Sequence, residues 1–179
     1  MKKIILILIL LHVGLNASSL DAVIVKHDWS KKKIAKIEKI LEFSTKEFEL
    51  GLITLSDLTS WNTKLFVEKK RKLDIEYEYK VKEDPSLKGS DFEESLNYVS
   101  ALLNISIQQV NFYEKMIPII KDMVSVGAMA GRDFEIYKLN SLEAYSQYDY
   151  ALSLYKAQHP KEKIPYKLPI NIVEKLNFN

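Results

Sequence analysis

The sequence predicts an all-α fold of long antiparallel helical hairpins with coiled-coil-like packing. Over long segments, apolar residues recur at steps of three and four, as on one face of a helix. Two glycines, Gly51 and Gly127, interrupt these segments, and each is followed six positions later by an aspartate, Asp57 or Asp133. Glycine tolerates left-handed backbone and weakens a helix by roughly 1 kcal/mol relative to alanine. We therefore predict two helix-turn-helix repeats, at about residues 30–83 and 91–158.

Residues 1–19 have the pattern of a secretory signal peptide. Lys2 and Lys3 precede an apolar run at residues 4–11, and Ala17-Ser18-Ser19 supply the small residues that a signal peptidase prefers. The run is shorter than the roughly 20 residues of a spanning helix, and a retained membrane anchor is the alternative interpretation. We expect an exported, periplasmic protein whose helical-hairpin domain covers residues 20–158.

The composition argues against several kinds of function. Loss of Lys2 and Lys3 would take the formal net charge from +2 to neutral, which leaves no basic surplus for nucleic-acid binding. The chain has no cysteine, so disulfides, thiolate metal sites and a lipid-modified cysteine are excluded. No linker rich in glycine, serine or proline divides residues 20–158, and we expect one domain stabilised by packing alone.

The first repeat begins with a stripe of small and apolar residues at helical spacing: Ile34, Ile37, Leu41, Ser44, Phe48 and Gly51. This stripe predicts a helix from about Ser30 to Leu50. After the glycine, Ser56 or Asp57 is expected to cap the next helix. The charged run 68–72 in that helix is interpreted as a solvated face rather than a binding patch.

Residues 74–82 leave two interpretations open. Their apolar residues alternate strictly, as in a strand with one buried face, and the other nearby strand candidate is the short segment 22–26. A lone strand would leave backbone groups unpaired, so we favour helix. Pro85, Gly89 and the polar residues around them predict a turn at residues 84–91.

The second repeat is predicted from two further stripes. The first stripe, in residues 92–126, consists of Leu96, Val99, Leu103, Ile107, Val110, Tyr113, Ile117, Ile120 and Val124. The second, in residues 134–158, consists of Phe134, Ser141, Tyr145, Tyr148, Leu152 and Tyr155. Pro118 is expected to kink or open the first of these helices. Three prolines in the tail, residues 159–179, favour an extended segment.

The two turns resemble those of the TolC family of outer-membrane efflux channels. In that family, long paired helices of a periplasmic tunnel meet at a tip beside a Gly-x-x-Thr/Ser-x-x-Asp sequence. Gly51, Thr54 and Asp57 match all three positions. In the second copy Gly127 and Asp133 match, whereas Ala130 stands where the family has threonine or serine. The resemblance covers about residues 30–158 and implies a fold of the TolC tunnel type.

The resemblance implies a component of efflux or type I secretion that acts through helix–helix contacts. Both turns would lie at the periplasmic tip, where channels close and meet the hairpins of periplasmic adaptor proteins. Arg132, beside Asp133, would be a candidate for charged contacts between subunits. The family's membrane strands, of about 9 to 11 alternating residues each, have no convincing pair here. We expect a protein that is either soluble in the periplasm or peripherally associated with the outer membrane, without a complete barrel.

Two further alternatives remain open at this stage. The tyrosines of residues 137–155 could form a contact surface, but a helix-packing core is the favoured interpretation. The helical stripes could pair within one chain as a closed bundle, or several copies could assemble around a tunnel. A periplasmic or secreted interaction protein unrelated to efflux is the alternative function.

An enzyme is not expected. Only His27 and His159 would remain after signal cleavage, and neither has the neighbours of a zinc site. The chain has no cysteine nucleophile, no phosphate-binding glycine loop and no serine in a nucleophile-elbow context. We therefore expect no metal and no cofactor, and a function that depends on a protein partner.

Overall fold

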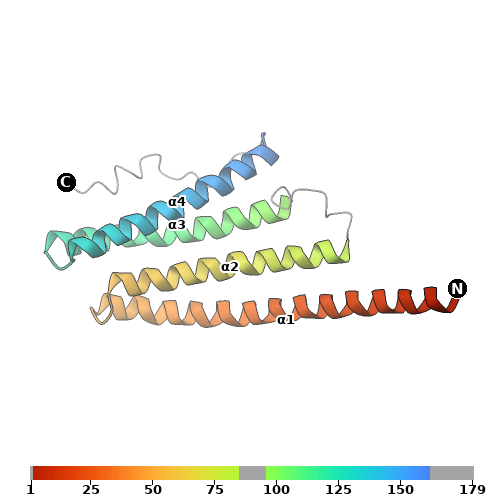
Figure 1. Cartoon of the computed structure of the whole chain (residues 1–179). Coiled ribbons are helices and arrows are strands. Elements are labelled where there is room, and N and C mark those ends of the chain that lie inside the picture. Colours follow the sequence, from red (N-terminus) through yellow and green to blue (C-terminus); the bar gives the residue numbers. More distant parts are fainter. Residues whose placement is uncertain (1, 85–95, 162–179) are drawn as a thin grey trace.

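The protein is all-helical in the part of the chain that the structure describes. A computed structural model covers residues 2–84 and 96–161, with side chains described from Leu20 to Asp84 and from Tyr98 to Lys161. Four helices, α1 (Lys2–Glu49), α2 (Leu55–Glu83), α3 (Leu96–Ser125) and α4 (Gly131–Gln158), form two hairpins (Figure 1). The predicted fold class is confirmed at this level.

Helix α1 is longer than the sequence pattern predicted. It begins at Lys2 rather than near Ser30, and the strand candidate at residues 22–26 lies inside it. The reason is that the buried stripe continues upstream of the predicted start: Val23 and Ser30 are 1% and 2% exposed. The favoured helix at residues 74–82 is confirmed, since this segment lies within α2. Leu73 and Ile75 are both buried although two residues apart, because α2 contacts other helices on more than one side, and this burial produces alternation without a strand.

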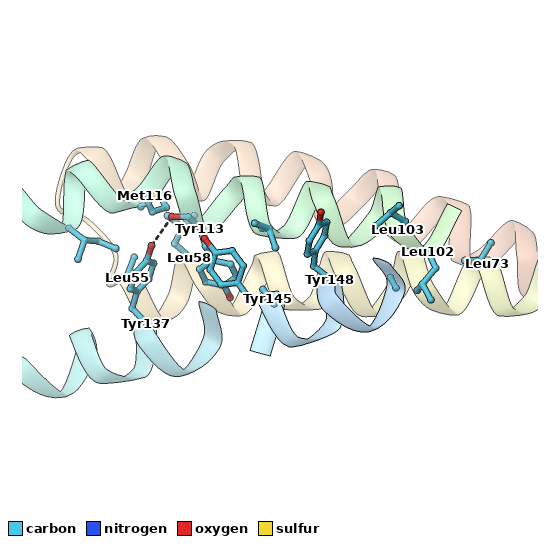
Figure 2. Packing of buried hydrophobic residues seen from close by; sticks show 14 of the residues in the cluster. Leu55, Leu58, Leu73, Leu102, Leu103, Tyr113, Met116, Tyr137, Tyr145 and Tyr148 are labelled. Carbon is cyan, nitrogen blue, oxygen red and sulfur yellow. Dashed lines mark hydrogen bonds between the residues drawn. The ribbon is translucent and has the colours of Figure 1, made fainter. Parts of the chain in front are cut away.

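Helix α2 is central to the packing, because it contacts each of the other three helices. Helix α4 packs against both α3 and α2, while α1 packs along α2. The buried cluster drawn in Figure 2 joins side chains of α2, α3 and α4, with Phe48 from α1. Leu58, Val99 and Val110 at its centre are fully buried. The helical stripes of one chain therefore bury one another.

The interface between α1 and α2 contains many polar contacts. The Ser30 hydroxyl donates a 2.8 Å hydrogen bond to the buried carboxylate of Glu68. The His27 ring lies 2.9 Å from Glu76, which also accepts a 2.7 Å hydrogen bond from Lys72. Partial burial disfavours ionised Glu76, but the hydrogen bonds from Lys72 and His27 outweigh it and hold the pKa of this carboxyl below its usual value. Polar and charged pairs thus join these two helices.

The interface between α3 and α4 is aromatic instead. The Tyr137 hydroxyl donates a 2.6 Å hydrogen bond to the carbonyl oxygen of Tyr113, and both rings are 1% exposed (Figure 2). Burial raises the pKa of each phenol above its usual value, because it disfavours the charged phenolate. Tyr145 and Tyr148 are also buried, whereas Tyr150 is 48% exposed. The core interpretation is therefore confirmed for Tyr137, Tyr145 and Tyr148.

The ends of the second hairpin follow the predicted pattern in part. Helix α3 contains Pro118 and continues through it to Ser125, and α4 ends at Gln158 as expected. The turn predicted at residues 84–91 and the tail beyond residue 161 lie outside the described residues, except for Asp84. For the predicted signal peptide, only the backbone from Lys2 is described. Among the described residues, no helix has an apolar stretch long enough to cross a membrane.

Candidate partner-binding turns

The two turns after Gly51 and Gly127 have the same backbone geometry. The φ angles of the two glycines are +72° and +68°, in the left-handed region that disfavours other residues. In the first turn, Gly51 N–H donates to the carbonyl of Phe48, and Leu52 N–H to that of Glu47.

The second turn repeats this pair of hydrogen bonds. Gly127 N–H donates to the carbonyl of Val124, and Ala128 N–H to that of Met123. This pairing is the Schellman motif, which satisfies carbonyl groups left free where a helix ends. Both glycines therefore end their helices in the same way, as the sequence predicted.

The start of α2 carries a capping box. Thr54, rather than Ser56 or Asp57, is the N-cap residue, and its hydroxyl accepts a 3.1 Å hydrogen bond from the backbone N–H of Asp57. The Asp57 carboxylate in turn accepts from the backbone N–H and the hydroxyl of Thr54, at 3.1 and 2.7 Å. These hydrogen bonds, the side-chain one first, hold the pKa of Asp57 below its usual range. The prediction of Ser56 or Asp57 as the N-cap residue was wrong. Asp57 is instead the third residue of the helix, whose side chain bonds back to the N-cap residue Thr54.

The start of α4 has no equivalent box. Its N-cap residue is Ala130, which has no side-chain oxygen and makes no side-chain cap. Asp133 occupies the position of Asp57, but its backbone N–H bonds the Ala130 carbonyl. Asp133 therefore does not form a capping box, because the methyl group of Ala130 cannot take part in the reciprocal pair. Its carboxylate still lies in the first helical turn, where the helix dipole favours negative charge.

Both turns lie at the same end of the molecule (Figure 1). Ile53 from the first turn and Met129 from the second pack against the same hydrophobic cluster. The predicted site residues therefore gather at one end: Gly51, Thr54 and Asp57 from one hairpin, and Gly127, Arg132 and Asp133 from the other. Arg132 is exposed and forms no ion pair with any described residue, Asp133 included.

Sequence reasoning missed the apolar side chains of this end. Leu50 is 72% exposed, Leu52 69% and Val126 75%. These side chains lie outside the buried stripes, so the helical spacing gave no indication of them. A signal was present: Leu50 and Val126 each stand immediately before a turn glycine, at equivalent positions of the repeat. The turn-bearing end therefore exposes apolar groups beside polar and charged ones.

The described residues contain no group of three or more histidine, cysteine, aspartate or glutamate side chains that could hold a metal ion. Comparisons with protein-family models, with curated proteins and with solved structures found no match. The candidate site therefore rests on the geometry and chemistry of the two turns.

Proposed function

We propose that this chain is a non-catalytic, TolC-like periplasmic component of efflux or type I secretion. It would act through helix–helix contacts, with further copies of itself or with an adaptor protein, at the end that carries both turns. The observation that carries the proposal is the repeated turn. Two glycine-ended helices of matching geometry lie at one end and present exposed apolar side chains there.

The chemistry of this end suits a protein surface. Protein interfaces commonly combine an apolar centre with a polar rim. Leu50, Leu52 and Val126 supply apolar area, and Asp57 and Arg132 supply charge beside it. Because both turns are fixed by backbone hydrogen bonds, and the first also by the capping box, little ordering would be needed on binding.

The periplasmic location belongs to the same proposal. It rests on the pattern of residues 1–19, in which two lysines precede a short apolar run and a group of small residues. Peripheral outer-membrane association is compatible with it.

A second candidate function is an exported helical-bundle protein that binds partners unrelated to efflux. One observation favours it: Leu58, Val110, Ala144 and Ala151, on three different helices, are 0% exposed within a single chain. A bundle whose stripes are already buried does not need further copies to complete its core.

In-cell photocrosslinking distinguishes these proposals. A photoreactive amino acid replaces Leu52 in one variant and Val126 in another, and crosslinked proteins are identified by mass spectrometry. Val67, which is 57% exposed on α2 and away from the turns, is the matched control position.

We expect adducts from positions 52 and 126, and few or none from position 67. A periplasmic adaptor, a TolC-like channel or a second copy of the chain among the adducts would support the efflux proposal. Other exported proteins crosslinked from both turns would support the second candidate. No adducts from either turn, or the same adducts from all three positions, would refute the turn end as the binding site.

A further inference from the structure

Helix α1 carries a second stripe on the side opposite its contact with α2. The members of this outer stripe are spaced by four, three, four, three and four residues: Val25, Trp29, Lys32, Lys36, Lys39 and Phe43. At 3.6 residues per turn, this spacing places them on one face of the helix. All six are exposed, and Val25, Trp29 and Phe43 remain 55%, 59% and 52% exposed.

The three lysines of the outer stripe make no close ion pair with acidic residues that the structure describes. The hydrogen bond and charge of Lys46 lower the pKa of Glu42, and the charge of Lys39 adds a smaller effect. The Lys32 ammonium lies 5.0 Å from the centre of the Trp29 ring, and that of Lys39 5.9 Å from the Phe43 ring. These are cation–π distances, so cationic and aromatic groups share one surface.

The basic cluster of α2 provides the contrast. Lys69, Lys70 and Lys72 lie 3.0, 3.2 and 2.7 Å from carboxylates of Glu38, Asp74 and Glu76. The interpretation of residues 68–72 as a solvated face holds only for Lys70 and Arg71, which are exposed, and is wrong for Glu68, which is buried, and for Lys69 and Lys72, which are half-buried. The ammonium groups of the outer stripe, which have no carboxylate within ion-pair distance among the described residues, are accessible to an external anion.

Of the acidic residues between Val25 and Phe43, Glu38 lies well away from the outer stripe, whereas Asp28 and Glu42 stand at its edge, four residues before Lys32 and three after Lys39. Glu38 and Glu42 are also paired, with Lys69 and Lys46. The six positions of the outer stripe carry only basic and apolar side chains, and the acidic Asp21 and Glu47 stand one helical turn beyond its two ends.

We propose that the outer stripe docks onto the surface of a lipid bilayer that contains anionic phospholipids. This goes beyond the proposed function, which concerns the turn end. Tryptophan concentrates at the boundary between headgroups and acyl chains, and lysines bind anionic headgroups there. With 1.5 Å per residue, the stripe would lie along the surface for about 27 Å.

The order of residues favours lipid over a protein helix or a second copy. A coiled-coil partner requires apolar groups at successive positions of the stripe, where they would interdigitate. Here three successive positions are lysines, and the apolar groups stand at the two ends. Two such stripes facing one another would also place six positive charges together.

The two tryptophans of the chain give a direct test. The Trp61→Phe variant leaves Trp29 as the fluorescent reporter, and the Trp29→Phe variant leaves Trp61. Trp61 is a matched control because it also has a lysine three residues later, with the Lys64 ammonium 4.0 Å from its ring. Each full-length variant is mixed with vesicles of equal parts phosphatidylglycerol and phosphatidylcholine, or of phosphatidylcholine alone, some containing brominated acyl chains.

We expect Trp29 emission to shift to shorter wavelength and to be quenched by brominated lipid on the anionic vesicles, more strongly than Trp61. An unchanged Trp29 spectrum, equal quenching of both reporters, or an equal response to both vesicle types would overturn the proposal. A shift of Trp29 that appears with rising protein concentration and no vesicles would assign the stripe to self-association and would also overturn it.

Charge-neutralising variants provide the second test. Replacing Lys32, Lys36 and Lys39 together by glutamine should reduce partitioning onto anionic vesicles by roughly 100-fold. The control replaces the exposed lysines Lys64, Lys80 and Lys115, which changes the net charge equally. All variants keep residues 1–19, so a difference in vesicle binding between the two triple variants is due to the outer stripe. An equal loss in both triple variants would contradict docking through α1.

Discussion

The two hairpins have turns of the same geometry but interfaces of different chemistry. Both turns end a helix with a left-handed glycine and the same pair of backbone hydrogen bonds. Between α1 and α2, however, the contacts include Ser30 with Glu68 and His27 with Glu76, whereas α3 and α4 bury tyrosines against one another. The backbone conformation at the glycine therefore determines the turn, whereas the chemistry of the helix interface can differ between two hairpins with the same turn.

The largest contrast should come from the buried side chains of each interface. Replacing Tyr148, which is 1% exposed, by alanine should lower the free energy of unfolding by about 3–5 kcal/mol, because it removes a large buried ring. Replacing Ser30 by alanine should cost about 1–3 kcal/mol, since buried Glu68 loses a hydrogen-bond donor. Chemical denaturation monitored by circular dichroism measures both, and equal losses would argue against the difference between the interfaces.

The shared turn geometry predicts equal effects at the two glycines. Leucine at Gly51 or at Gly127 should each cost about 1–2 kcal/mol, because a side chain disfavours the left-handed backbone that both glycines adopt. The same denaturation experiment measures both losses. Gly131→Ala is the control: its backbone is not left-handed and no atom lies within 4 Å of an added Cβ, so the change should be neutral or stabilising. Unchanged stability in both leucine variants would refute the proposed turns.

Changing the N-cap residue of either α2 or α4 to that of the other helix should make the two turns more alike in stability. Thr54→Ala should destabilise α2 by about 1 kcal/mol, since the capping box is lost. Ala130→Thr should stabilise α4 by up to about 1 kcal/mol, because Asp133 already stands three residues later, as Asp57 does after Thr54. Thermal unfolding of the two variants and the double variant measures these changes. A loss on introducing threonine at position 130 would show that the turns are not equivalent.

Acid should loosen the first hairpin before the second. The carboxyls of Glu42, Asp57, Glu76 and Glu78, whose pKa values are lowered, all belong to the first hairpin. A lowered folded-state pKa stabilises the protein above the unfolded pKa of about 4, and this stability is lost as pH falls through the folded value. Hydrogen exchange below about pH 4.5 should therefore show earlier loss of protection in α1 and α2 than in α4. Uniform loss across all helices would contradict this.

Much of the fold could be predicted from the sequence, because helical spacing and helix-ending glycines are local signals. They located both turns and the stripe from Ile34 to Phe48. The start of α1 was missed because the polar residue Ser30 separates the buried Val23 from the apolar stripe that the prediction followed. The cap was placed wrongly because Ser56, Asp57 and Thr54 all suit an N-cap, and only the backbone geometry at Thr54 distinguishes them.

The candidate site was predicted less completely. Its glycines and polar residues could be found from spacing, and the structure brings them to one end of the molecule. The exposed Leu50, Leu52 and Val126 could not be separated from core residues by type alone, since apolar side chains at helix ends can lie inside or outside. Efflux, export and the choice of partner stay predictions.

Distance measurement between spin labels tests most directly whether both turns share one end. One pair replaces Leu52 and Val126, and the reference pair replaces Leu52 and Lys82, at opposite ends of α2. Because α2 has 29 residues, the reference labels should lie about 40 Å apart. Labels at positions 52 and 126 should be clearly closer together than that. A 52–126 distance as long as the reference would place the turns at opposite ends and contradict the proposed binding end.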